Sequence, residues 1–370
     1  MQNVLVSGAS VAGLTLAYWL RRNGFAVTVV ERAPAVRPGG QAIDVRGVAL
    51  DVLDRTGILA EARQVRTRMR GMAMLDAEGK ELWRTTDHTF SSGRLDSEDI
   101  ELLREDLAVL LHRQAVDAGV EFLFGDSVAT LDEETDGVRV GFEQGPARTF
   151  AFVLGADGLH SKVRQLAFGP EEQFIRHLGA YLTVFSTHNF LGLDNWQVWL
   201  NDDAATYCLY PVRDNTEMRA TLGFRSEPIA YDHRDTEQQK ALMTAGLAHV
   251  GWETPRLLEA MRQAPDFYFD SMAQIHMERW STGRVALTGD AGYCPSPLSG
   301  QGTSLALVGA YVLAAELGRA DGDHAAAFAR YETRMRPFVG LNQALADKNA
   351  GGAPSDEAMD EAKNGIELDA

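Results

Sequence analysis

Three motifs built from glycine, serine and aspartate contain the residues of this 370-residue chain that could do chemistry. The first is Gly8-Ala9-Ser10-Val11-Ala12-Gly13, which follows an apolar strand over 3–6 and opens a helix over 11–22. Gly8 permits a tight turn, and Gly13 lets the helix pack closely on the strand. A pyrophosphate could then lie at the helix N-terminus, where free N–H groups and the helix dipole favour anions. Ser10 replaces a glycine of the usual fingerprint, but it is small and its hydroxyl can itself reach a phosphate.

Glu31 ends a second strand over 25–31 and adds an acid to this turn. A carboxylate in this place accepts hydrogen bonds from both ribose hydroxyls of a dinucleotide and would repel a 2′-phosphate. The order strand, turn, helix, strand and acid therefore predicts a site for FAD or NAD rather than NADP. The alternative is a glycine turn that only joins a strand to a helix, with Glu31 as a solvated strand end.

The second motif is Gly155-Ala156-Asp157-Gly158, followed by Ser161 and Arg164. Asp157 comes at the end of a predicted strand over 150–155, and open α/β sheets bind ligands at the carboxyl ends of their strands. An Asp-Gly turn is common by itself, so a purely structural turn is an equally good interpretation of this motif.

The third motif joins Gly289-Asp290-Ala291 to Pro297-Leu298-Ser299-Gly300-Gln301-Gly302, just before an apolar helix over 305–317. Gly300 and Gly302 would let a flat ligand approach bare backbone at a helix N-terminus. That arrangement would stabilise negative charge that develops at the N1 and O2 edge of a reduced flavin. The alternative is a proline-rich loop that starts a helix.

The hydrophobic pattern around the motifs predicts an α/β fold, because the βαβ opening implies a parallel sheet. Aromatic and β-branched runs predict a second, antiparallel sheet. The elements expected for the first sheet and its helices are strands over 120–124, 138–142, 150–155 and 284–288, helices over 48–54, 99–118 and 305–317, and a loop over 34–47. Those expected for the second are a hairpin over 71–84, strands over 181–185, 196–200, 207–211 and 218–224, and helices over 235–250 and 255–263.

These elements predict a discontinuous Rossmann-like nucleotide domain with an inserted antiparallel-sheet substrate domain. The nucleotide domain takes residues 1–70, 99–173 and 279–340, and the substrate domain takes 71–98 and 174–278. Residues 341–370 are polar and acidic, which predicts a tail or a surface helix.

The formal net charge of −17 makes nucleic-acid binding and contact with a membrane through a basic patch unfavourable. The sequence has no apolar run of the ~20 residues that a spanning helix needs. Its first residues lack the basic region of a signal peptide, and their apolar stretch runs straight into a glycine turn, so a cytoplasmic location is expected. Cys208 and Cys294 are expected to be ordinary thiols, and no metal-ligand spacing is found, so no metal is predicted.

In this order and at these intervals, the three motifs resemble those of the group A FAD-dependent aromatic hydroxylases, which share the p-hydroxybenzoate hydroxylase fold. The sequence is most similar to the short branch of that family, which includes tetracycline-inactivating monooxygenases, and the resemblance covers about residues 2–340. It implies an FAD-binding domain of the glutathione-reductase type.

The resemblance also implies a role for individual residues, although solvated surface charges are the alternative for Arg37 and Arg104. Arg37 and Arg164 would contact NAD(P)H. The residues that would bind FAD are Gly8, Ser10, Gly13, Glu31, Arg32, Asp44, Arg104, Asp157, Asp290 and, at the flavin edge, Pro297, Gly300 and Gly302.

The implied reaction is hydroxylation of an aromatic or polyketide-like molecule with NADPH or NADH and O2, through a flavin C4a-hydroperoxide. The flavin performs the chemistry, so no catalytic side chain is assigned. The protein is expected to be a monomer or a weak homo-oligomer. Aromatic residues of the second sheet could line the substrate pocket, with packing inside the sheet as the alternative for each: Phe185, Trp199, Tyr207, Tyr210 and Phe224.

Other flavin functions remain open. A non-oxygenating reductase or dehydrogenase, a Baeyer–Villiger oxygenase and a flavin-bound sequestering protein would all use the same motifs. A flavin halogenase is disfavoured, because Trp196-Gln197-Val198-Trp199-Leu200 lacks the Trp-x-Trp-x-Ile-Pro spacing. Three positions depart from the family pattern: Gly292-Tyr293 replaces a frequent His, Ser304 a frequent Asn, and Gly309-Ala310 an Asp-Ala pair.

Overall fold

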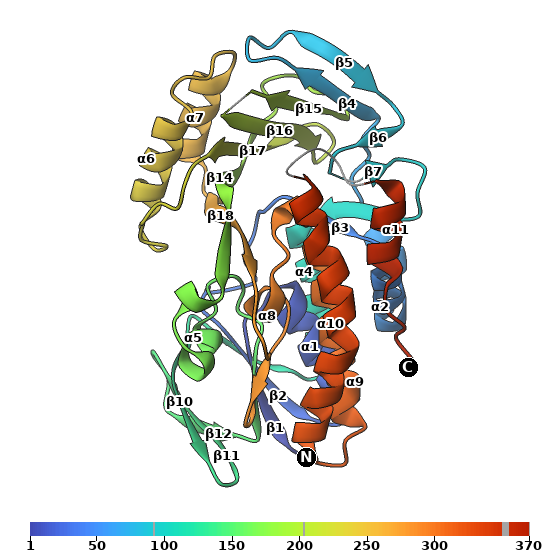
Figure 1. Ribbon diagram of the computed structural model, residues 1–370, viewed down its shortest axis with the longest axis vertical. Coiled ribbons are helices and arrows are strands. Elements are labelled where there is room, and N and C mark those ends of the chain that lie inside the picture. The colour runs from blue at the N-terminus through green and yellow to red at the C-terminus, as the bar shows by residue number, and fades with distance from the viewer. Residues whose placement is uncertain (92, 203, 350–354, 370) are drawn as a thin grey trace.

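A six-stranded sheet in the lower half of the molecule carries the three motifs (Figure 1). The computed structural model describes residues 1–91, 93–202, 204–349 and 355–369. All neighbouring pairs in this sheet are parallel except β19–β20, so the predicted βαβ opening and parallel sheet are confirmed. In spatial order the strands are β19 (Ser281–Thr282), β20 (Val285–Leu287), β13 (Phe152–Gly155), β1 (Asn3–Ser7), β2 (Ala26–Glu31) and β9 (Glu121–Phe124).

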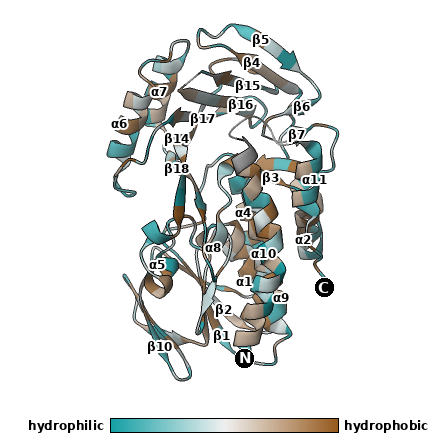
Figure 2. Ribbon diagram, in the orientation of Figure 1, coloured by the Kyte–Doolittle hydropathy of each residue, from teal (hydrophilic) through white to brown (hydrophobic). Residues whose placement is uncertain are grey.

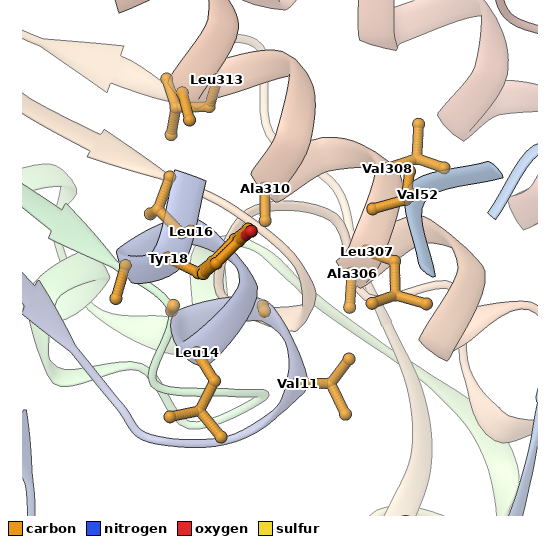
Figure 3. Packing of buried hydrophobic residues seen from close by; sticks show 14 of the residues in the cluster. Val11, Leu14, Leu16, Tyr18, Val52, Ala306, Leu307, Val308, Ala310 and Leu313 are labelled. Atoms are coloured by element: carbon orange, nitrogen blue, oxygen red, sulfur yellow. The ribbon is translucent and has the colours of Figure 1, made fainter. Parts of the chain in front are cut away.

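Helix α9 (Gly302–Gly318) lies at the centre of the helical layer beside this sheet. It is apolar all round because it packs between α1 (Val11–Arg22), α2 (Val48–Thr56) and α10 (His324–Asn349). Figure 3 shows Tyr18 of α1 against Ala310 of α9, and Val52 of α2 beside Val308. The remaining elements of this half are α3 (Leu59–Gln64), α4 (Arg104–Asp117), α5 (Lys162–Phe168), α8 (Asp290–Tyr293) and the small sheet of β10 (Val128–Glu134), β11 (Gly137–Phe142) and β12 (Arg148–Phe150).

A seven-stranded sheet forms the upper half, and the long strands β14 and β18 reach down toward the lower half (Figure 1). Its pairs are antiparallel apart from β15–β4, which confirms the predicted antiparallel insertion. In spatial order the strands are β18 (Tyr268–Ile275), β14 (Ile175–His188), β17 (Glu217–Arg225), β16 (Ala205–Val212), β15 (Trp196–Asn201), β4 (Gly71–Leu75) and β5 (Glu81–Thr85).

The two faces of this sheet have different neighbours. Side chains alternate between faces along a strand, and one face packs on α6 (Thr236–Gly246) and α7 (Thr254–Gln263), where Tyr207 and Leu222 join one apolar cluster. On the other face, Tyr210 and Cys208 form a separate small cluster with Leu103, at the junction with the lower half. The edge strand β5 is exposed, and its colouring in Figure 2 is more hydrophilic than that of β16.

Several predicted elements are corrected by long-range pairing. Strand β3 (Ala42–Val45) lies inside the predicted loop over 34–47, and β8 (Ile100–Leu103) replaces the start of the helix predicted over 99–118. The two pair antiparallel, and this pairing of distant segments overrides the local helical pattern. The sequence analysis missed β10, β18 and α10. Helix α10 runs through position 341, and α11 (Asp356–Asn364) follows within the acidic segment.

Within the described ranges, no helix combines the length and the apolar character that crossing a membrane requires.

Candidate FAD and substrate site

The first glycine turn brings α1 into close contact with two strands. A Cβ on Gly8, at φ +105°, would lie 2.5 Å from the carbonyl oxygen of Ala156, and a Cβ on Gly13 would lie 1.9 Å from that of Gly8. Only glycine fits both positions. Ser10 makes no side-chain cap, and the first turn of α1 has no acidic residue. The N-terminus of α1 is therefore able to receive an anion.

Glu31 is held over this turn by backbone groups. Its carboxylate accepts hydrogen bonds from the N–H groups of Ala9 (2.8 Å) and Ala33 (2.9 Å). This fixes the acid next to the helix N-terminus, in the place that a ribose-binding carboxylate requires. Arg32 follows it with an exposed side chain.

Arg104 lies at the start of α4, and one of its buried donors has no acceptor in the described ranges. Its Nη2 donates to the carbonyl oxygens of Arg37 (2.6 Å) and Gly39 (2.8 Å), whereas its buried Nε has no partner among the described residues. Burial, together with the charge of Arg37, lowers the pKa of Arg104 to about 10. A Cβ on Gly40 would lie 2.5 Å from this Nε. An acceptor on a bound cofactor would satisfy the orphaned donor, so the residues present fit FAD.

Arg46 is a site residue that the sequence analysis missed. Its guanidinium lies 3.0 Å from the carboxylate of Asp44 and 3.7 Å from where a Cβ on Gly300 would be. Its backbone N–H donates to Ser304 Oγ (3.1 Å), and its buried Nε has no partner in the described ranges. The sequence did contain a signal for Arg46. This arginine lies two residues after Asp44, and residues two apart in an extended segment share a face.

Asp44 is buried next to two further acids. Desolvation raises its pKa to about 7; Arg46 opposes the rise, while Glu101 and Asp99 add to it. Burial raises the pKa of Glu101 in the same way, against hydrogen bonds from Ser91 and Thr67. At this end of the site, burial therefore raises the pKa of both carboxylic acids, Asp44 to about 7.

A chain of hydrogen bonds links the substrate sheet to Arg46. The indole of Trp199 donates to Gln197 Oε1 (2.5 Å), and the amide of Gln197 donates to Ser91 Oγ (2.7 Å). Arg46 donates to the carbonyl oxygen of Ser91 (2.5 Å). Gln197 and Ser91 were also missed, because nothing local in the sequence brings β15 to this loop.

The third motif also lies next to Arg46, through Gly300. Gly300 adopts a left-handed conformation (φ +63°) between a short 3-10 turn over Pro297–Ser299 and α9, which begins at Gly302. Pro297 is exposed, and Asp290 begins α8 half-buried. Burial raises the pKa of Asp290 to about 6, against a hydrogen bond with Cys294. Both cysteines are buried and free.

The side chains of the second motif make hydrogen bonds within the protein that hold the start of α5. The carboxylate of Asp157 accepts from the N–H groups of Lys162 (2.9 Å) and Val163 (3.1 Å), and so holds the start of α5. Arg164 has no exposed surface, and it donates to Ala291 O (3.0 Å) and to Glu171 (2.6 Å). The prediction that Arg164 contacts NAD(P)H is wrong for this conformation, because a surface cofactor cannot reach it. Arg37 is exposed, with its guanidinium 5.6 Å from the ring centre of Tyr268.

The five aromatic residues predicted to bind substrate lie on two opposite faces of the sheet. Phe185, Tyr207 and Phe224 are buried in the core on the face that α6 and α7 cover. They cannot contact a ligand at the flavin edge, which corrects the prediction for these three. Trp199 and Tyr210 lie on the other face, where Tyr210 Oη accepts from the N–H of Ala42 (2.6 Å) next to Asp44.

The comparisons with known proteins agree with this geometry. A family model described as an FAD binding domain matches residues 1–342. A flavin-dependent monooxygenase of Legionella longbeachae is 40% identical over 342 residues, which cover 92% of this chain and 86% of the relative. The chain belongs to the FAD-binding flavoprotein monooxygenase family. An uncharacterised protein of Mycobacterium tuberculosis is 55% identical over 355 residues, 96% of this chain and 95% of that protein.

Solved structures confirm the predicted fold class and the family resemblance. The tetracycline destructases Tet(51) and Tet(55) each superpose with a TM-score of 0.87, at 36% and 38% identity. The match to Tet(51) covers 99% of this monooxygenase and 95% of the destructase; the match to Tet(55) covers 100% and 98%. CtdE, solved in complex with FAD, has the same fold at 17% identity, with a TM-score of 0.76 over 98% of each chain.

Proposed function

We propose that this monooxygenase uses NAD(P)H and O2 to hydroxylate a flat aromatic or polyketide-like molecule. The observation that carries the proposal is the hydrogen-bond chain from Trp199 through Gln197 and Ser91 to Arg46, whose guanidinium lies beside Gly300. This chain supports an aromatic surface at Trp199 near the loop where the flavin edge is expected. The similarity to tetracycline destructases supports a polycyclic substrate.

The chain's own groups would position the reactants. The N-terminus of α1 and Glu31 would hold the pyrophosphate and a ribose, and Arg104 would donate from its free Nε. Asp290 and the backbone of Gly300 and Gly302 would bind the ribityl chain and the flavin edge. When bound, FAD would supply electron transfer from NAD(P)H and the activation of O2.

The substrate would stack on Trp199, which Gln197 positions. Since Gln197 is buried and is fixed by Ser91, its amide holds the indole of Trp199 in a defined orientation toward a ligand. Arg37 is the exposed cation available to NAD(P)H near the Gly39-Gly40 turn.

The test is NADPH and NADH oxidation in air by the FAD-loaded protein, with a panel of phenols and aromatic polyketides that includes tetracyclines. We expect one class to accelerate oxidation and to gain one oxygen atom by mass spectrometry. NMR of the product separates hydroxylation from ring expansion by Baeyer–Villiger oxygenation. Oxidation of NAD(P)H with no oxygen in any product would favour a reductase or dehydrogenase.

A further inference from the structure

A cluster of two histidines and a glutamate lies away from the predicted flavin site. His160 follows the Asp157 motif, Glu171 begins the 3-10 turn Glu171–Gln173, and His233 lies between β17 and α6. One donor atom of each side chain lies within 4.8 Å of the others. The sequence showed no metal-ligand spacing, because these three residues are far apart along the chain.

The spacing of the donors suits one small cation. His160 Nδ1 and Glu171 Oε1 are 2.8 Å apart. Two ligands bound at roughly 2.1 Å to the same tetrahedral metal are about 3.4 Å apart, so a separation of the pair by roughly 0.6 Å would admit the ion. The ring of His233 lies with its centre 3.7 Å from that of His160, and His233 is exposed, so an ion can enter from that side.

An outer layer of groups orients the two inner ligands. His160 Nε2 lies 3.0 Å from Asp270 Oδ1, and Asp270 also accepts from Tyr268 Oη (2.9 Å). The second oxygen of Glu171 pairs with Arg164 (2.6 Å). A carboxylate behind a histidine fixes the ring and raises its basicity, an arrangement found around most histidine metal ligands.

We propose that His160, Glu171 and His233 bind a divalent transition-metal cation such as Zn²⁺. The cation would replace the proton shared between His160 and Glu171 and leave a remaining position for water. It would also tie the loop that contains His233, which belongs to the upper half, to the Asp157 motif of the lower half. The competing interpretation is an ion-pair network of His160 with Glu171 and Asp270, to which His233 adds nothing.

The His233→Ala variant separates the two interpretations, because it removes an exposed donor and leaves the ion pairs intact. FAD-loaded, EDTA-treated protein is titrated with Zn²⁺ by calorimetry, and its melting temperature is measured with and without Zn²⁺. We expect one Zn²⁺ per wild-type chain at micromolar concentration and a higher melting temperature. Changes in an outer layer cost about 10–100-fold in affinity, so loss of a direct ligand should cost at least about 100-fold.

His249→Ala is the matched control, because His249 is an exposed histidine beside Asp202 (3.7 Å) and lies outside the cluster. This variant should bind Zn²⁺ like the wild type. With Cu²⁺ as a second probe, electron paramagnetic resonance should show two imidazole nitrogens in the wild type and one in His233→Ala. Absence of binding in the wild type, or equal binding in His233→Ala, would overturn the proposal.

Discussion

At the scale of single residues, two departures from the family pattern meet in space. The hydroxyl of Tyr293 bonds to Thr288 Oγ1 (3.0 Å) and Tyr331 Oη (2.9 Å) over the surface of Gly309. A Cβ on Gly309 would lie 1.9 Å from Tyr293 Oη. The large residue at position 293 therefore requires a residue without a Cβ at position 309.

Gly309→Ala should lower the free energy of unfolding by about 1–3 kcal/mol, the usual cost of an overpacked core. Urea unfolding followed by circular dichroism measures the effect. Gly340→Ala is the control, because Gly340 lies in a helix and a Cβ there meets no atom within 4 Å. It should be neutral or slightly stabilising, since alanine favours helices. Equal effects of the two substitutions would contradict this account of Gly309.

The pKa of Asp44 predicts a pH dependence of stability. Folding raises this pKa from 3.8 to about 7, so the folded state holds a proton that the unfolded chain releases. The contribution of Asp44 to the free energy of unfolding should therefore fall as pH rises from about 4 to about 7. Asp44→Asn should make the fall between about pH 5 and about pH 7.5 smaller in urea titrations. Asp51→Asn, at an exposed site on α2, should keep the wild-type slope.

At the scale of elements, a buried arginine joins the substrate sheet to the FAD-binding loop. Arg219 of β17 is 2% exposed, and it pairs with Glu105 of α4 (2.8 Å) and donates to the carbonyl oxygen of Gly40 (3.2 Å). The carboxylate of Glu105 also accepts a hydrogen bond from the N–H of Gly39 (2.7 Å). These interactions fix the turn at Gly39 and Gly40, and therefore Arg104, relative to the upper sheet.

Arg219→Met should cost on the order of 3 kcal/mol in stability, because it leaves a partly buried carboxylate short of its partner. Glu105 keeps its pair with Arg213, which limits the loss. FAD affinity, measured by flavin fluorescence, should also fall, because the turn at Gly39 and Gly40 is released. Arg70→Met removes an exposed pair with Asp194 and should cost less than about 1 kcal/mol with unchanged FAD affinity.

At the scale of the whole molecule, the function depends on which face of the upper sheet meets the lower half. The face of Trp199 lies toward the loop of Arg46, whereas the face of Tyr207 packs under α6 and α7. Both residues are aromatic and lie on neighbouring strands. We nevertheless expect substitution of Trp199 to change substrate binding and substitution of Tyr207 to leave it unchanged.

Trp199→Ala should raise KM for the aromatic substrate by at least about tenfold, which is the loss of roughly 1.4 kcal/mol of binding. Steady-state kinetics on the first accepted compound of the panel measures this. Tyr207→Phe removes one hydrogen bond with Thr254 (2.9 Å) and should lower stability slightly while KM stays unchanged. A higher KM in Tyr207→Phe than in Trp199→Ala would show that substrate binds on the helix-covered face.

The sequence by itself determined the local features, which depend only on residues close together in the chain. The turn of Gly8 and Gly13, the acid at Glu31 and the helix at Gly302 follow from local backbone demands, so their pattern predicted the fold class and the family. The flavin roles of these residues stay predictions. The aromatic and β-branched runs also identified the aromatic residues of the upper sheet, but not which face each would share with the cofactor.

Only the tertiary structure decided which distant segments meet. A strand reveals its period of two without revealing which face is covered, and for that reason Phe185, Tyr207 and Phe224 were wrongly assigned to the substrate pocket. Pairing between segments about 60 residues apart turned predicted loop and helix into β3 and β8. The same long-range packing buried Arg164, brought Arg46 to Gly300 and gathered His160, Glu171 and His233. Such contacts are set by how sheets and helices stack, and no local pattern encodes them.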